Sequence, residues 1–132
     1  MIVSYVIWVV CYSCLILTIF IALYGIITRP NLIKKIIAYT IFSDSINLFI
    51  VFLGYRRLPN AKIAVLPLKP TPEEIVMYEE TAVDPLVQCL VLTAIVIGLA
   101  VILFFTFLAI QLYRLYGTLD SREITKKSRL RW

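Results

Sequence analysis

Three long blocks of hydrophobic residues alternate with short polar segments along the chain. The blocks run from about residue 2 to 27, from 35 to 55 and from 85 to 113. Each is at least as long as the roughly 20 residues that a helix needs to cross a bilayer. The pattern predicts an all-α membrane protein with three transmembrane helices. These form one domain, residues 1–116, which is followed by a polar tail, residues 117–132.

The segments between the blocks contain residues that end helices and start new ones. An Arg-Pro pair at 29–30 ends the first block, because proline disfavours helix in the residue before it. From 56 to 84 the chain is rich in proline and glutamate and cannot span, so we expect an external loop. Within it, Thr-Pro-Glu-Glu at 71–74 is typical of a capped helix start and predicts a short interfacial helix over 75–81. Asp-Pro at 84–85 starts the third span in the same way.

The charged residues lie at the ends of the blocks and predict an orientation. Lysine and arginine number 13 against 8 aspartates and glutamates, a net charge of +5. The basic residues flank hydrophobic blocks and form no patch with interleaved aromatics, so we expect no nucleic-acid partner. The first loop and the tail are both basic, and basic loops stay in the cytoplasm. We therefore expect the N-terminus outside and the C-terminus in the cytoplasm.

Composition excludes most catalytic chemistry. The chain is 61% hydrophobic with a mean hydropathy of +0.93, too apolar for a soluble domain of this size. It has no histidine, and its three cysteines lie inside hydrophobic blocks, where a thiol behaves as a small hydrophobe. We therefore expect no metal site, no cofactor and no active site in this chain.

The second span carries the polar residues that call for an explanation. Asp44 is the only carboxylate in any span, and an aspartate at a helix centre costs about 2.5–3.5 kcal/mol on insertion scales. Thr40 and Asn47 share its face at helical spacing, with Ser43 beside them. The functional interpretation is an ion or proton relay; the alternative is hydrogen bonding between helices, which returns only about 0.6 kcal/mol on average. In the third span, Thr93 and Gln88 are weaker candidates.

Small residues recur at helical spacing in the first and third spans and predict close helix packing. They are Cys11, Cys14, Thr18, Ala22 and Gly25 in the first span, and Ala94 and Gly98 in the third. A redox function for the two cysteines of the first span is disfavoured, because reactive thiols need polar, accessible surroundings. Aromatic residues near the span ends are typical of anchors at the membrane interface. They include Trp8 and Tyr55.

The start of the third span, residues 84–97, reads DPLVQCLVLTAIVI. It resembles the DPLPQALxLTAIVI motif of the MrpC family, small three-span subunits of multisubunit Na+/H+ antiporters. That family is similar to the NuoK subunit of respiratory complex I and also occurs in membrane-bound hydrogenases. The polar second span, residues 42–48, is similar to the family's second helix, so the resemblance covers most of residues 1–116. Val87 replaces the family's second proline, and Gly98 stands near a position where NuoK-type subunits carry a glutamate.

The resemblance implies a non-catalytic subunit of a multisubunit cation/proton antiporter in a prokaryotic plasma membrane. Its implied partners are MrpA- or MrpD-like antiporter subunits and other small Mrp-type subunits, with Na+ and H+ as the transported ions. Asp44, at or beside the family's second-span glutamate, would contribute with Ser43 and Asn47 to a hydrated path. Two alternatives stay open: a membrane-arm subunit of a hydrogenase or complex I-like oxidoreductase, and a purely structural adaptor.

Overall fold

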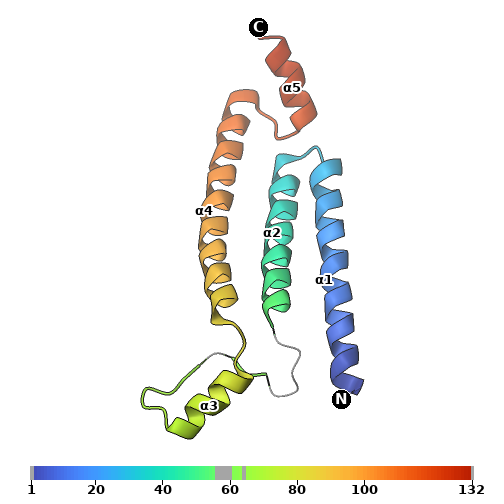
Figure 1. The fold of residues 1–132 in the computed structure, drawn as a ribbon. Helices are drawn as coiled ribbons and strands as arrows, with labels where there is room; N and C mark the ends of the chain where they lie inside the picture. The colour runs from blue at the N-terminus through green and yellow to red at the C-terminus, as the bar shows by residue number, and fades with distance from the viewer. Residues whose placement is uncertain (1, 56–60, 64, 132) are drawn as a thin grey trace.

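The computed structural model describes residues 2–55, 61–63 and 65–131. Three helices in this part of the chain are long and apolar enough to cross a membrane, which confirms the expected all-α, three-span class. Two short helices complete the described structure (Figure 1). The five elements are α1 (Ile2–Thr28), α2 (Leu32–Gly54), α3 (Pro72–Thr81), α4 (Pro85–Tyr116) and α5 (Ser121–Arg129).

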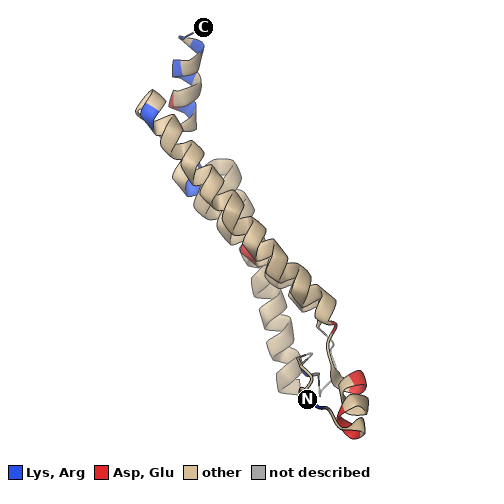
Figure 2. Ribbon diagram, turned by 90° about the vertical axis from the view of Figure 1, so that its left-hand side faces the viewer, with Lys and Arg blue, Asp and Glu red and all other residues tan. Residues whose placement is uncertain are grey.

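The spanning helices form a single row in which α2 is the middle member. It packs against α1 on one side and α4 on the other, and the row is thin when it is turned by 90° (Figures 1 and 2). Few side chains in the described part of the chain are buried, and they are mostly small: Ala22, Ala38, Ser45, Val83, Val91 and Ala109. Because one layer of helices has two open faces, each spanning helix presents most of its surface to lipid or to other proteins.

Local capping fixes where α2 and α4 begin. Asn31 caps α2, and its Oδ1 accepts a hydrogen bond from the backbone N–H of Ile33 at 2.9 Å. This cap starts the helix at Leu32, a turn earlier than the block that begins near residue 35. Asp84 caps α4 in the same way, through the N–H of Leu86 at 2.9 Å, as the sequence predicts.

The short helix α3 has the full capping box that residues 71–74 predict. The Thr71 hydroxyl accepts from the N–H of Glu74, and the Glu74 carboxylate accepts from the N–H of Thr71 at 2.8 Å. The helix begins at Pro72, three residues before the expected start. Residues 56–60 and 64 of the predicted external loop lie outside the described part. The described part of the loop lies against the end of α3. The Lys62 N–H donates to Thr81 O, and the Val83 N–H donates to Lys62 O.

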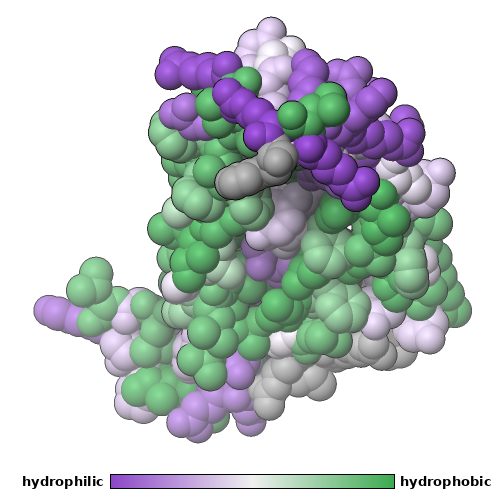
Figure 3. Space-filling view, turned by 90° about the horizontal axis from the view of Figure 1, so that it is seen from above, coloured by the Kyte–Doolittle hydropathy of each residue, from purple (hydrophilic) through white to green (hydrophobic). Residues whose placement is uncertain are grey.

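The opposite end of the row is tied together by backbone hydrogen bonds. Gly117 ends α4 in the left-handed conformation at φ +69°, which only glycine adopts without strain. The connector then bonds to the loop between α1 and α2, with Leu32 N–H donating to Leu119 O and Ser121 N–H donating to Pro30 O. The tail, for which the sequence analysis predicts no element, continues as α5. Figure 3 looks onto this end and shows hydrophilic side chains gathered over it, beside large hydrophobic areas.

Candidate functional site

The polar residues of α2 follow a stripe from the contact with α4 to the open surface. Ser43 faces α4, because a Cβ atom built on Gly98 would lie 3.8 Å from the Ser43 Oγ. Thr40 and Asn47 are half-buried, and the Thr40 hydroxyl donates to Ile36 O within the helix at 2.9 Å. Asp44 is exposed. The stripe therefore begins between α2 and α4 and ends at Asp44, which no other helix of the described part of the chain covers.

The exposed residues around Asp44 on α2 are hydrophobic, whereas Thr40 and Asn47 beside it are half-buried. Residues three or four apart share one face of a helix, and the exposed ones at that spacing from Asp44 are Ile41 and Leu48. Among the described residues, no hydrogen bond or ion pair reaches the Asp44 carboxylate. A carboxylate at membrane depth on a hydrophobic face needs a partner or water from outside the chain.

The neighbouring residue Ser45 has a structural role. It is 5% exposed, and its hydroxyl donates to Ile41 O at 2.7 Å. Ser43, Asp44 and Ser45 are consecutive polar residues of this span, yet they have different surroundings, because successive side chains point about 100° apart around a helix. Ser43 faces α4, Asp44 faces outward, and Ser45 is buried.

The polar candidates of α4 lie apart from this stripe. Thr93 is exposed and its hydroxyl donates to Cys89 O within the helix at 3.1 Å. It precedes Gly98 by five residues, about 140° around the helix, so it faces away from Ser43. Gln88 is half-buried near the start of α4. The structure thus brings Ser43 and Gly98 together and leaves Thr93 on another face.

The small residues of α1 divide into a packed group and an exposed group. Ala22 is 4% exposed, and a Cβ atom built on Gly25 would lie 3.2 Å from the Cβ of Ala38 in α2. Cys11 and Cys14 are exposed. Thr18 is half-buried with its hydroxyl bonded to Cys14 O at 2.8 Å, and Ala94 in α4 is also half-buried. The close approach of α1 to α2 is therefore centred on Ala22 and Gly25.

Aromatic side chains form the other half of the α1–α2 contact, which the sequence analysis does not predict. The Trp8 ring lies 4.7 Å from Phe52 and 6.1 Å from Tyr55, and the Tyr12 ring lies 5.6 Å from Phe49. Trp8 and Tyr55 were expected only as interface anchors. The sequence gives no sign of these ring contacts, because the two residues of each contact lie more than 35 residues apart.

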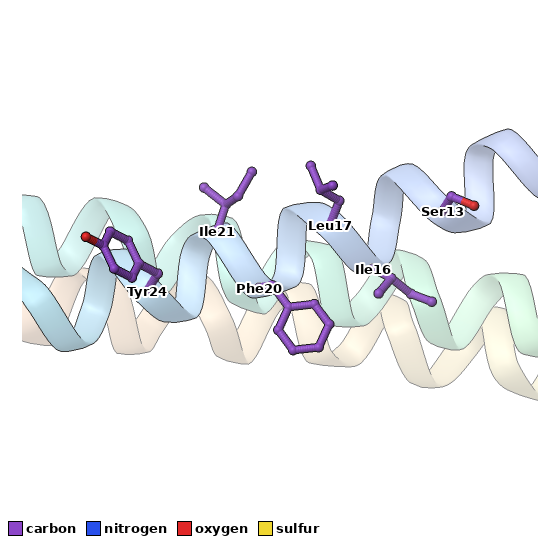
Figure 4. Close-up of a pocket in the computed structure, with 6 residues that line it drawn as sticks. All are labelled: Ser13, Ile16, Leu17, Phe20, Ile21 and Tyr24. Atoms are coloured by element: carbon purple, nitrogen blue, oxygen red, sulfur yellow. The ribbon is translucent and has the colours of Figure 1, made fainter.

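The outer face of α1 has a shallow groove without the features of a binding site for ions. Six residues of that one helix line it, and apart from the Ser13 hydroxyl and the Tyr24 phenol they are aliphatic or phenyl side chains (Figure 4). They are Ser13, Ile16, Leu17, Phe20, Ile21 and Tyr24. Ser13 donates its hydroxyl hydrogen to Val9 O at 2.8 Å, inside the helix. Such a face is what a spanning helix presents to lipid chains.

Comparison with known proteins identifies the family. Residues 10–128, which include most of α1 and all of α2 and α4, match the family described as NADH-ubiquinone/plastoquinone oxidoreductase chain 4L. The chain belongs to the chain 4L family. This membership, together with the relatives below, confirms the resemblance to MrpC and NuoK that the motif at 84–97 indicates.

Relatives of this chain 4L protein come from antiporters and respiratory complexes. The Na+/H+ antiporter subunit C1 of Staphylococcus saprophyticus is 34% identical over 104 residues, 76% of this chain and 77% of the relative. An uncharacterized protein of Methanocaldococcus jannaschii is 32% identical over 111 residues, 84% of this chain and 82% of the relative. A solved chain of the membrane-bound sulfane sulfur reductase, an archaeal respiratory membrane complex, is 37% identical with a TM-score of 0.71, covering 85% of this chain and 94% of that one. This member of the chain 4L family is thus a multi-pass membrane protein whose relatives include subunits of multisubunit complexes.

Proposed function

We propose that this chain is a non-catalytic membrane subunit of a multisubunit cation/proton antiporter, in which it contributes packing surfaces and the Asp44 carboxylate to Na+ and H+ translocation. The observation that carries the proposal is the exposed acid of α2, whose exposed neighbours Ile41 and Leu48 are hydrophobic. A subunit that worked alone would leave this group in lipid at a cost of about 2.5–3.5 kcal/mol. A neighbouring subunit that covers the face would complete the hydrated path that the polar stripe begins.

The larger partners would be MrpA- or MrpD-like antiporter subunits, with other small Mrp-type subunits beside them. Support comes from the subunit C1 relative, whose name makes it one subunit of a Na+/H+ antiporter. It also comes from the open faces of the helix row, because three helices in one layer cannot enclose a pathway. The partner that matters for transport would lie on the side of α2 that exposes Asp44, next to α4.

The orientation proposed for the chain puts α5 in the cytoplasm of a prokaryotic cell and α3 outside. Basic residues lie toward the α5 end of the row and most acidic ones toward the α3 end (Figure 2). At the α5 end, the loop and the ends of the spans contribute Arg29, Lys34, Lys35 and Arg114. Short basic loops are retained in the cytoplasm, which supports this placement in the plasma membrane.

The test is cation-dependent proton transport by the complete complex carrying Asp44→Asn. We expect the variant to assemble with its partner subunits and to lose most of its transport rate, since an amide can neither exchange a proton nor neutralise a cation. Asp44→Glu should retain part of the rate. Glu123→Gln, which makes the same acid-to-amide change on the exposed surface of α5, is the matched control and should transport normally. Normal transport by assembled Asp44→Asn complexes would refute the proposal and favour a structural adaptor.

A second candidate is the membrane arm of a redox-driven complex. The observation that favours it is the similarity to a chain of the membrane-bound sulfane sulfur reductase. In that case the same subunit would couple ion movement to electron transfer on other chains. Purifying the native complex and identifying its subunits by mass spectrometry decides between the two, because a redox-driven complex would contain subunits with redox centres.

A further inference from the structure

A hydrophobic groove runs between the three spanning helices at the α5 end of the row. It has a volume of about 320 Å³ and is lined by carbon atoms alone. One wall comes from the end of α1, the floor from the first two turns of α2, and the other wall from the last turns of α4. Its lining residues include Ile26, Ile36, Tyr39, Phe105 and Leu108. The groove is separate from the polar stripe that contains Asp44.

One charged residue, Lys35, also lines this hydrophobic groove. Its side chain is half-buried, which places the aliphatic stem against the groove. Among the described residues, its ammonium group has no hydrogen-bond or ion-pair partner. The first turn of α2 contains Lys34 and Lys35 and no acidic residue. A hydrophobic groove in which the stem of an unpaired lysine forms part of the lining, at one end of the spanning helices, suits an amphipathic occupant with an anionic head.

We propose that the groove binds an acyl chain of an anionic phospholipid whose phosphate lies at the Lys35 ammonium group. The charge at this end favours an anionic head, because basic pockets between spanning helices bind such headgroups. An acyl chain below a phosphate also matches the order of the groove, which is hydrophobic along its lining and has Lys34 and Lys35 in the first turn of α2.

The first experiment measures lipid retention by the purified chain in detergent micelles. Native mass spectrometry is run with added phosphatidylglycerol and, separately, with phosphatidylcholine of the same acyl chains. We expect phosphatidylglycerol to be retained preferentially and Lys35→Gln to lower its retention about fivefold, the equivalent of ~1 kcal/mol per basic side chain near an anionic lipid. The control Lys34→Gln removes the adjacent charge, which does not line the groove, and should change retention less. Equal retention of the two lipids, or equal losses in the two variants, would overturn the proposal.

A second measurement locates the lipid within the native complex. Leu108 lines the groove and is 41% exposed, so a photoreactive benzophenone side chain at this position would reach the occupant. We expect irradiation to give an adduct with the mass of a phospholipid. The same label at Leu103, which is exposed on α4 and does not line the groove, should give less of the adduct with anionic lipid. A covalent link from position 108 to another subunit would show that a protein helix covers the groove and would reject the lipid.

Discussion

Replacing Gly54 with alanine would place a methyl group inside the space that Val87 occupies. A Cβ atom at Gly54 would lie 2.8 Å from Val87 Cγ2 and 2.9 Å from Val87 Cβ and Cγ1. Carbon atoms in good contact are about 3.5–4.0 Å apart, so the helices must separate or shift. A change of rotamer does not relieve the clash, because the Val87 Cβ is fixed by the backbone of α4.

The expected loss of stability follows from two opposing terms. Overpacking a close contact costs about 1–3 kcal/mol. Replacing glycine with alanine in a helix returns at most about 1 kcal/mol, and less at the last residue of α2. We therefore expect Gly54→Ala to lower the free energy of unfolding by about 1–2 kcal/mol. The effect should arise in the contact between α2 and α4 at the end near α3.

The assay is unfolding in mixed micelles of mild detergent and dodecyl sulfate, followed by the fluorescence of Trp8. The chain has two tryptophans, so a Trp132→Phe background makes Trp8 the only reporter. Trp8 is suitable because its ring lies 4.7 Å from Phe52 and 6.1 Å from Tyr55, on either side of Gly54 in the sequence.

A second substitution separates the steric clash from a general loss of stability. In Gly54→Ala/Val87→Ala the two valine methyl groups are gone and only the 2.9 Å contact with the Cβ of residue 87 remains, so the double variant should be more stable than the sum of the single changes by about 1 kcal/mol. Leu86→Ala is the control, because Leu86 adjoins Val87 and is 63% exposed. Combined with Gly54→Ala, it should give an additive loss of stability. Additivity of Gly54→Ala with Val87→Ala to within about 0.5 kcal/mol would refute the predicted contact.

Three further predictions concern single residues. Gly25→Val should destabilise the α1–α2 contact by about 1–3 kcal/mol in the same assay, because a Cβ there already lies 3.2 Å from Ala38; unchanged stability would contradict that approach. Thr71→Ala should cost α3 about 0.5–2 kcal/mol and speed hydrogen exchange at the Glu74 amide, whereas unchanged exchange would argue against the capping box. Gly117→Ala should cost about 1–2 kcal/mol through its positive φ alone, since no atom lies within 4 Å of the added Cβ; proteolysis of the tail measures it, and a rate equal to wild type would contradict this.

The features that the sequence predicts are those set by nearby residues. Hydrophobic length fixes the three spans, because a spanning helix satisfies its own backbone hydrogen bonds whatever its neighbours are. The starts of α3 and α4 depend on side chains within three residues of the cap, so Thr71 and Asp84 were recognisable in the sequence. Asn31 is an equally local cap. The hydrophobic block was nevertheless taken to begin after the basic residues Lys34 and Lys35, so the predicted start of α2, near residue 35, lies three residues after the observed start at Leu32.

Contacts between helices depend on which faces meet, and the sequence does not contain that information locally. Gly54 and Val87 are separated by 32 residues, and nothing in either span shows that these two residues lie opposite each other. Small residues at helical spacing predict that some face of α1 packs closely. They do not show that Gly25 meets Ala38 while Cys11 and Cys14 stay exposed.

The polar stripe of α2 shows how one turn of helix can serve both folding and a partner. Ser43 is accommodated within the chain opposite Gly98 of α4, where an added Cβ atom would lie 3.8 Å from the Ser43 Oγ. One residue later, Asp44 projects from the open face, where nothing in the described part of the chain can neutralise it. The proposed partner subunit would therefore set the environment of this carboxylate, because the cost of a charge in the membrane depends on the groups and the water brought to it.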